Sequence, residues 1–381
     1  MHKIKYLTIA GVVINLCIGG LYYVNSYQYT QLDSNQTESI VPSDDDDPSA
    51  NVTLNNYTNV LPDEKFVTLN FWHFAGLGNQ FWRIASLYGI AKQINRTPYF
   101  NSELPTLTES YEYYAKYFPN IIPSEIIKFI PGSTINETTR AFANGSRQYE
   151  DPKHLTNETV QYLRLSSSYV QGYKFFDEYK PFLKNVFQCA PNVVQHTREV
   201  AEKANWNLTQ HNFCVNTRRG DFVSIPHYRH SSKYFSNPAT EFVLDILQQK
   251  TSSHVNVIYS SDDAAFTKGL YNESRNGTTF IDSSDLKFNK YESLCFLIHN
   301  CDSVLLTATG TTFGWWFAYL KEKPGDIYYD GVLANAKLDW ILDDYVPPWW
   351  HRVCVESGVP KLVGFKKCQG NSAYPYKDYT S

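Results

Sequence analysis

Two adjacent arginines followed by an acidic residue form the most chemically distinctive segment of this 381-residue chain, Arg218-Arg219-Gly220-Asp221. The segment follows residues 212–217, whose apolar pattern predicts a short strand. A guanidinium group binds two oxygens of a phosphate at once and keeps its charge. Asp221 can hold one arginine in place or take a proton from a substrate. The segment therefore predicts an anion-binding site, with a surface Arg–Asp pair worth less than about 1 kcal/mol as the alternative.

Two neighbouring carboxylates, Asp262 and Asp263, end a second predicted strand, residues 254–261. A carboxylate at a strand end can accept hydrogen bonds from ribose hydroxyls or from the edge of a base. One rival is a divalent-metal site, since adjacent carboxylates attract Mg²⁺ or Mn²⁺. The other is a helix N-cap, which is the use that we expect for one member of the pair.

Two turns that contain glycine complete the set of candidate segments. The first is Gly76-Leu77-Gly78-Asn79-Gln80, and the second runs from Thr309 through Gly310-Thr311-Thr312-Phe313-Gly314 to Trp315-Trp316. Glycines let backbone N–H groups approach an anion, and a following helix N-terminus favours negative charge. The hydroxyls of the second turn suit the same purpose. We expect its two tryptophans to pack the helix rather than to stack on a sugar.

All four segments lie where a predicted strand gives way to a turn or helix. Strands and helices alternate from about residue 65, with predicted strands at 66–74, 212–217, 254–261 and 303–307 and predicted helices at 81–94, 237–249, 291–300 and 313–320. This alternation is typical of parallel sheets with helices on both faces, which bind ligands at the carboxyl ends of their strands. Two such blocks with a cleft between them fit the length. No order is predicted within residues 100–200.

The N-terminus predicts a membrane anchor. Residues 6–24 form a 19-residue apolar run that spans about 28 Å as a helix, and the basic residues precede it. The positive-inside rule then places the rest of the chain outside the cytosol or in a lumen. A cleaved signal peptide ending near Gly19-Gly20 is the alternative. The net charge of −4 excludes a strongly basic nucleic-acid binder, so no nucleic-acid partner is expected.

Two further patterns agree with a lumenal chain. Six cysteines lie beyond the anchor, which allows up to three disulfides in fifteen pairings, and a Cys354–Cys368 pair would close a loop near the C-terminus. No cysteine or histidine spacing suggests zinc. Glycosylation triplets Asn-x-Ser/Thr begin at Asn35, Asn51, Asn56, Asn95, Asn136, Asn144, Asn157, Asn207, Asn272 and Asn276.

As a set, the four segments resemble the motifs of the GDP-fucose-dependent α-1,2-fucosyltransferases, glycosyltransferase family 11. That family has a GLGNQ turn (here residues 76–80), an HxRRGD signature (216–221), a strand ending in SDD (261–263) and an STFSWW-like helix start (311–316). The resemblance implies a GT-B-like α/β fold of two Rossmann-like lobes with a cleft, preceded by a single transmembrane helix and a stalk. The implied organisation is a cytosolic tail 1–5, a signal-anchor 6–24, a lumenal stem 25–64, an N-terminal lobe 65–205, a C-terminal GDP-sugar-binding lobe 206–350 and a tail 351–381.

The resemblance also implies a type II Golgi membrane enzyme that moves fucose from GDP-β-L-fucose to a galactose-terminated glycan, with inversion and without a metal or cofactor. Arg218 would grip the β-phosphate, and Asp221 is a candidate base whose expected role is to hold an arginine. Asp262 would contact the nucleoside, and the Gly76–Asn79 turn would close over the diphosphate or the acceptor oxygen. The remaining expected substrate contacts are Gly76, Gly78, Asn79, Asn216, Arg219, Asp263, Thr311, Thr312 and Gly314.

One residue departs from the family's motif, because Asn216 stands where the signature has histidine. In related enzymes this histidine lies beside the nucleotide, so the exchange bears on nucleotide contacts and on activity. The alternatives are a catalytically silent glycan- or nucleotide-binding protein of the same fold, a fucosyltransferase of another linkage, and an adhesive surface protein. The last would leave the arginine pair and the Thr-rich turn without a role.

Overall fold

The computed structural model describes residues 57, 59–69, 76–121, 126–143, 145–167, 169–251, 254–334, 340–364 and 368. The predicted anchor 6–24 and the predicted glycosylation sites Asn35, Asn51, Asn56 and Asn144 lie outside these residues. Within the described ranges, no helix is both long enough and apolar enough to cross a membrane.

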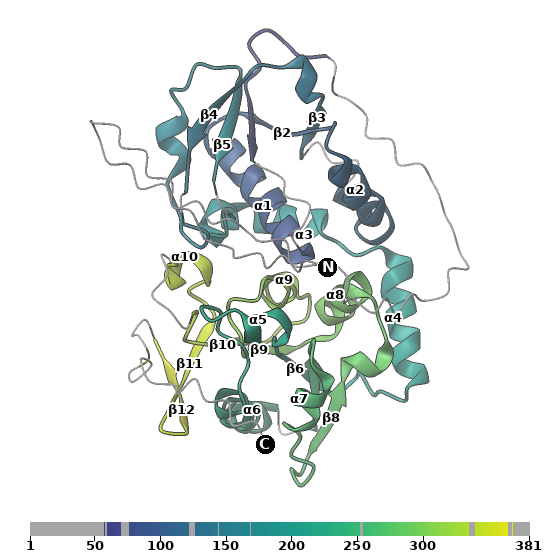
Figure 1. Cartoon of the computed structure of the whole chain (residues 1–381). Helices are drawn as coiled ribbons and strands as arrows, with labels where there is room; N and C mark the ends of the chain where they lie inside the picture. Colours follow the sequence, from purple (N-terminus) through teal and green to yellow (C-terminus); the bar gives the residue numbers. More distant parts are fainter. Residues whose placement is uncertain are drawn as a thin grey trace, which may run out of the picture. The chain divides into compact units, whose positions relative to one another are not determined.

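A five-stranded sheet occupies the first part of the described chain (Figure 1). Its strand order is β3-β2-β1-β5-β4, and every neighbouring pair is parallel. Helix α1 packs against β1 and β2. The sheet includes strands from the region 100–200, for which the sequence predicted no order. The bounds are β1 (Phe66–Leu69), α1 (Leu77–Gln93), β2 (Thr97–Asn101), α2 (Pro105–Tyr117), β3 (Lys128–Ile130), β4 (Glu137–Ala141) and β5 (Tyr162–Ser166).

A seven-stranded sheet forms the second part, in the order β12-β11-β10-β9-β6-β7-β8. All its neighbouring pairs are parallel except β11–β12, which is antiparallel. The strands are β6 (His211–Asn216), β7 (Val255–Ser260), β8 (Thr278–Asp282), β9 (Ser303–Leu306), β10 (Ile327–Asp330), β11 (His351–Glu356) and β12 (Val359–Val363). Strands β11 and β12 fall within the predicted tail 351–381 and extend this sheet. The prediction of an α/β protein with two parallel sheets is confirmed.

The remaining helices are α3 (Lys180–Val186), α4 (Pro191–Lys203), α5 (Gly220–Ser224), α6 (Lys233–Thr251), α7 (Ala264–Lys268), α8 (Lys290–Asn300), α9 (Thr312–Leu320) and α10 (Leu342–Tyr345). Helix α8 begins with a capping box between Asn289 and Glu292, which satisfies backbone N–H groups at its start.

The predicted start of helix α6 at Asn237-Pro238 is wrong. The helix begins at Lys233, because the Ser232 carbonyl accepts hydrogen bonds from the N–H groups of Phe235 and Ser236, and Pro238 lies inside it. Pro238 lacks an N–H group and therefore removes one hydrogen bond of the helix ladder. The buried side chains of Phe235 and Ser236 hold this extra turn against the protein.

Aromatic side chains fill the contact between α1 and α9. Trp82, Trp315 and Trp316 are each 0% exposed, and the Trp82 and Trp315 ring centroids are 4.2 Å apart. The indole N–H of Trp315 donates to the Tyr345 carbonyl at 2.9 Å. The expectation that the two tryptophans of the Thr-rich turn pack their helix is therefore confirmed.

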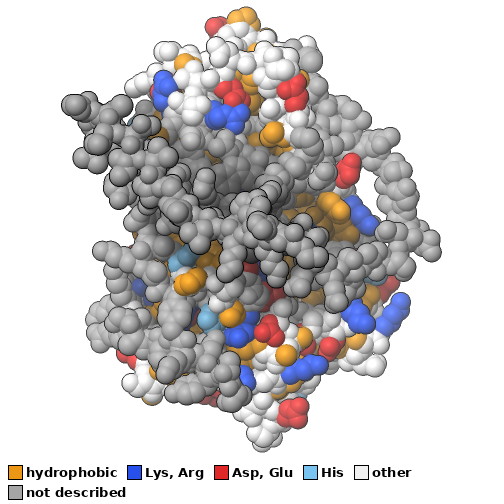
Figure 2. Space-filling view, in the orientation of Figure 1, with side chains coloured by type: hydrophobic (Ala, Val, Ile, Leu, Met, Phe, Trp, Pro, Cys, Tyr) orange, Lys and Arg blue, Asp and Glu red, His pale blue; other side chains and the backbone are white. Residues whose placement is uncertain are grey.

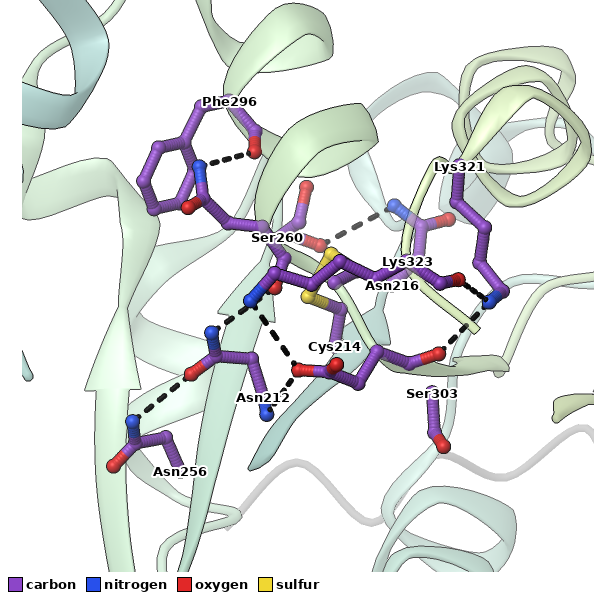
Figure 3. The surroundings of a disulfide bond; sticks show 12 residues. Asn212, Cys214, Asn216, Asn256, Ser260, Phe296, Ser303, Lys321 and Lys323 are labelled. Carbon is purple, nitrogen blue, oxygen red and sulfur yellow. Dashed lines mark hydrogen bonds and ion pairs between the residues drawn. A yellow bond between two sulfur atoms is a disulfide. The ribbon is translucent and has the colours of Figure 1, made fainter. Parts of the chain in front are cut away.

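Three disulfides join the six cysteines, namely Cys189–Cys295, Cys214–Cys301 and Cys354–Cys368. The second lies below the carboxyl end of β6 in a dense polar network (Figure 3). There Asn212 accepts a hydrogen bond from the Asn256 amide at 2.9 Å and donates to the Asn300 carbonyl at 3.0 Å. The amino ends of strands β6 and β7 are thereby tied to each other and to the end of helix α8.

We predict that removing a disulfide costs more stability where the closed loop is longer. Alanine at both Cys214 and Cys301, which are separated by 87 residues, should lower the free energy of unfolding by about 4–5 kcal/mol. The same change at Cys354 and Cys368, separated by 14 residues, should cost about 3 kcal/mol. Urea unfolding of the full chain measures both losses, and equal losses would contradict the loop-length explanation.

Candidate active site

The Arg218 side chain lies between carboxylates from two different strand ends. Its Nη2 atom is 2.6 Å from Asp221 Oδ1, and its Nη1 atom is 3.1 Å from Asp262 Oδ2. Arg218 follows β6 and Asp262 follows β7, so the parallel pairing of these strands brings two of the predicted segments together. The Arg218 side chain is 36% exposed, which leaves the guanidinium accessible to a ligand.

The Arg219 side chain is fixed inside the protein. It is 19% exposed, its Nε lies 3.1 Å from Asp263 Oδ2, and its Nη1 donates to the Ser231 carbonyl at 2.9 Å. The guanidinium also lies 4.5 Å from the centre of the Phe266 ring. These contacts suit a residue that shapes the loop, whereas the Arg218 side chain is the more exposed of the two.

Asp263 is the N-cap of helix α7. Its Oδ1 accepts from the Phe266 N–H at 2.9 Å, while its Oδ2 pairs with Arg219. The expectation that one member of the acidic pair caps a helix is confirmed. The neighbouring Asp262 instead accepts from the Arg219 backbone N–H at 2.8 Å and holds the loop in shape.

Sequence reasoning missed Ser231, which anchors the arginine loop. Ser231 is 0% exposed, and its hydroxyl accepts from the Arg218 backbone N–H at 2.9 Å. The same hydroxyl lies 2.6 Å from the Thr307 hydroxyl, which donates to the Asn216 carbonyl at 2.9 Å. A chain of hydrogen bonds thus joins the loop to the ends of β6 and β9. A single serine in a polar loop carries no sequence signal for this role.

Asn216 is buried against the start of helix α9. Its side chain is directed by a long 3.4 Å hydrogen bond from Nδ2 to the Ser260 carbonyl. Its Oδ1 atom is buried and has no hydrogen-bond partner among the described residues. A Cβ atom at Gly314 would lie 2.2 Å from this oxygen, so a side chain at position 314 and the Asn216 amide cannot share the space.

The two glycine-bearing turns are in contact. One begins helix α1, which packs on the five-stranded sheet, and the other follows strand β9 of the seven-stranded sheet. A Cβ atom at Gly78, in the first turn of α1, would lie 2.6–2.8 Å from backbone and hydroxyl atoms of Thr312. Gly76 is the N-cap of α1, and its carbonyl accepts from the Asn79 N–H at 2.9 Å. The Asn79 side chain accepts from the Gln171 amide at 2.7 Å. The predicted contacts Gly76, Gly78 and Asn79 therefore adjoin the predicted contact Thr312.

Arg147 is a second residue that sequence reasoning missed. Its guanidinium lies 3.8 Å from the centre of the Trp340 ring and donates from Nη2 to the Gly310 carbonyl at 2.7 Å. It is 6% exposed and lies in the region 100–200.

The Thr-rich turn is also held by its own side chains. The Thr309 hydroxyl donates to the Asp330 carbonyl at 2.7 Å, and Thr311 is buried at the N-cap of α9. Hydrogen bonds to Arg147 and to the Asp330 carbonyl thus hold the Thr-rich turn in place.

A buried ion pair supports this end of the second sheet. Arg229 Nε lies 3.2 Å from Asp330 Oδ2, and both side chains are almost fully buried. Burial raises the pKa of Asp330, and the Arg229 guanidinium opposes that rise. Removing either partner would leave an unpaired buried charge, which is costly.

The carboxylates of the site face arginines rather than a common centre. In the part of the chain that the structure describes, no three His, Cys, Asp or Glu side chains are grouped so that they could hold a metal ion. On the face shown in Figure 2, acidic and basic side chains are interspersed. The arrangement provides a partly exposed guanidinium, nearby backbone N–H groups at the start of α9, and carboxylates that orient the guanidinium.

Six of the ten predicted glycosylation sites lie in the described ranges. Five of them are exposed, namely Asn95, Asn136, Asn157, Asn207 and Asn276. Asn272 is half-buried, and its amide donates to Glu241 Oε1 at 3.1 Å. Attachment of a glycan at these positions stays a prediction.

Two largely parallel sheets carry an arginine loop and glycine-bearing turns at their strand ends, which is where α/β proteins typically bind ligands. The family model described as glycosyl transferase family 11 matches residues 75–331, a range that holds all four motifs. The chain belongs to glycosyltransferase family 11 and is a glycosyltransferase enzyme.

Two relatives carry names that agree with this assignment. A galactoside 2-alpha-L-fucosyltransferase of Caenorhabditis elegans is 26% identical over 388 residues, covering 89% of this chain and 91% of the relative. A putative galactoside 2-alpha-L-fucosyltransferase, svh-11, of the same organism is 27% identical and covers 75% of this chain and 78% of the relative. Among solved structures, a mutant of Arabidopsis thaliana FUT1 in complex with GDP has a TM-score of 0.45 at 13% identity, covering 81% of this chain and 85% of that one.

We predict that Gly314 and Asn216 are energetically coupled. Gly314→Ser should lower the free energy of unfolding by about 1–3 kcal/mol, because its Cβ overlaps Asn216 Oδ1. Asn216→Ala should relieve part of that loss, since the obstructing amide is gone, and a double-mutant cycle in urea measures the coupling. Gly76→Ala is the matched control, because a Cβ atom there meets nothing within 4 Å. Strict additivity of the two changes would refute the coupling.

Proposed function

We propose that this enzyme transfers L-fucose from GDP-β-L-fucose to a hydroxyl of a galactose-terminated glycan, in α-1,2 linkage and with inversion. The observation that carries the proposal is the 36% exposed Arg218 guanidinium at the carboxyl end of β6, within a chain of family 11. The names of the C. elegans relatives support the donor sugar, the acceptor and the linkage. Residues 6–24 and the glycosylation triplets support a type II Golgi membrane protein with a lumenal catalytic region.

Arg218 stabilises the leaving group in this mechanism. As the bond between the fucosyl C1 and the β-phosphate oxygen breaks, its electron pair passes to GDP and negative charge grows on the phosphate. A fixed guanidinium at that position lowers the barrier more than it tightens ground-state binding. One such contact is typically worth about 3–4 kcal/mol. The N–H groups of Thr312 and Gly314 and the hydroxyls of Thr311 and Thr312 add to the same charge stabilisation.

The acceptor hydroxyl attacks the fucosyl carbon from the face opposite the leaving GDP. This attack turns the β-linked donor into an α-linked product, and the hydroxyl loses its proton as the new bond forms. Asp221 is the candidate base beside Arg218, but its 2.6 Å bond to Arg218 suits an orienting role. A strongly oxocarbenium-like transition state needs only a weak base, which water can supply.

The first sheet contributes its turn to the donor site. Gly78 packs on Thr312, so the Gly76–Asn79 turn stands beside the helix start that would meet the diphosphate. Asp262 stands at the end of β7, where a carboxylate can meet the nucleoside. Asp262 now pairs with Arg218, and a bound donor would compete for the same guanidinium.

The experiment that tests this function is transfer from labelled GDP-fucose to galactose-terminated acceptors, followed by linkage analysis of the product. An α-1,2-linked fucose on galactose is the expected result. Binding of GDP-fucose without transfer or hydrolysis would instead identify a catalytically silent protein. A product with another linkage would overturn the assigned position of attack and leave the enzyme class intact.

We predict that Arg218→Lys lowers kcat at least tenfold, because an ammonium group cannot replace the planar fork that binds two phosphate oxygens. Arg140→Lys is the matched control. Arg140 is also a partly exposed arginine paired with a carboxylate, Glu158, but it lies in β4 and should keep wild-type rates. A near-normal turnover number for Arg218→Lys would refute the proposed role.

We also predict that transfer persists in excess EDTA. Asp262 and Asp263 are paired with arginines. In the proposed mechanism the Arg218 guanidinium neutralises the charge on the leaving diphosphate, which a metal ion does in other transferases. Initial rates should agree within about twofold with and without the chelator. Loss of transfer that Mn²⁺ restores would show that the acidic pair is a metal site.

A further inference from the structure

A pocket of about 480 Å³ lies beside strands β10 and β11, and none of the predicted site residues lines it. We call it the β10–β11 pocket. Its walls come from the 3₁₀ helix at Tyr173–Phe175, from β10, from the chain that enters β11, and from the end of β12. The residues used below are Tyr173, Lys174, Tyr329, Trp350, Arg352 and Gly364.

The pairing of the strands places this pocket close to the arginine loop. Tyr329 in β10 is paired with Leu306 in β9, and Leu306 is paired with Asn216 at the end of β6. Two strand spacings therefore separate Tyr329 from Asn216, which is about 10 Å across the sheet. Residues in register on neighbouring parallel strands also point to the same face. The pocket and Asn216 thus share one face of one sheet, the face that also carries helix α9.

Aromatic rings and hydrogen-bonding groups alternate around the pocket. Tyr173, Tyr329 and Trp350 contribute rings, and each is buried to nine-tenths or more. Arg352 Nε donates to the Tyr329 hydroxyl at 3.0 Å, and Arg352 Nη2 lies 3.0 Å from Asp343 Oδ1. Lys174 Nζ lies 2.5 Å from Asp344 Oδ1 on the opposite wall. These bonds hold the polar groups in fixed positions around the rings.

This lining matches the chemistry of a sugar ring. A pyranose has apolar C–H faces and a rim of hydroxyl groups, so rings can cover its faces while fixed charged groups bind its edge. Pockets for small ligands typically have 300–1,000 Å³ and combine aromatic walls with a few well-placed polar groups. Lys174 and Arg352 are each paired with a carboxylate, which favours a neutral polyol over a free anion.

We propose that the β10–β11 pocket binds the inner sugars of the acceptor glycan, while the terminal galactose is presented to the donor beside Arg218. The pocket is then a specificity site that favours longer acceptors. This inference rests on the proposed function, because it assigns the pocket to the acceptor of that reaction. No bond is made or broken in the pocket, so its contribution is confined to the binding of the acceptor.

Gly364 offers a way to block the pocket without disturbing the fold. Gly364 lines the pocket, and a Cβ atom there would meet no heavy atom within 4 Å. Gly364→Trp should fill part of the pocket. Gly364→Ala is the matched control, because a single methyl group enters open space. Tyr173→Leu tests the same site by a second route, since it keeps an apolar side chain and removes the flat ring.

The experiment compares two acceptors on the full chain, a galactose-terminated disaccharide and a galactose-terminated oligosaccharide of at least four sugars. Gly364→Trp and Tyr173→Leu should each raise KM for the oligosaccharide at least fivefold, with kcat unchanged and KM for the disaccharide within twofold of wild type. Gly364→Ala should change neither value. Equal KM values for both acceptors in the wild type, or equal effects of Gly364→Trp on both, would overturn the proposal.

A binding measurement separates this inference from the proposed function. The same oligosaccharide without its terminal galactose cannot be fucosylated at that sugar, and its binding is followed by tryptophan fluorescence. Binding to the wild type that is lost in Gly364→Trp supports the pocket even where no transfer occurs. Transfer to the disaccharide without any binding of the truncated oligosaccharide refutes the pocket and leaves the proposed function standing.

Discussion

The packing of helix α1 on helix α9 is the contact on which the rest of the site depends. Gly78 has no side chain, and only for that reason can the first turn of α1 reach the backbone of Thr312. Behind this contact, Trp82 and Trp315 fill the space between the helices. The first turn of α1 and the turn that follows β9 are thereby held side by side. Without that approach, the Gly76–Asn79 turn would have no fixed relation to the arginine loop.

A second constraint acts within the seven-stranded sheet. Arg218 projects from a loop that Ser231 and Thr307 tie to the ends of β6 and β9. At the opposite end of β6 the Asn212 network fixes the same strand, and the Cys214–Cys301 disulfide holds the strand between its two ends (Figure 3). The arginine therefore stands on a strand that is held at both ends, which is how rigid elements position a side chain for catalysis.

Much of this arrangement could be predicted from the sequence, because the motifs follow strands with a clear apolar pattern. Strands β6, β7 and β9 and helices α8 and α9 lie where the pattern indicates them. The first sheet was harder to predict, since its strands beyond β1 have only three to five residues and lie among many polar residues. The start of α6 was misplaced because Asn237-Pro238 has the composition of a helix start, while the hydrogen bonds to Ser232 that extend the helix leave no composition signal.

Single residues with a positioning role could not be predicted. Arg147 and Ser231 act through one or two hydrogen bonds to distant backbone atoms, so neither belongs to a periodic or spaced pattern. The burial of Asn216 beside Gly314 is likewise a fact of tertiary packing. Sequence reasoning identifies residue types that suit a reaction, whereas the partners that hold them emerge only when the strands are placed.

The carboxylates around Arg218 bear on how the proposed catalytic cycle ends. Asp221 and Asp262 both pair with the Arg218 guanidinium. In the proposed mechanism the donor's diphosphate displaces these bonds, so the net affinity gained in the ground state is smaller than for an unpaired arginine. Once fucose has been transferred, the same two carboxylates compete with the spent GDP for the arginine. Product release is thereby helped by the residues that orient the side chain for the reaction.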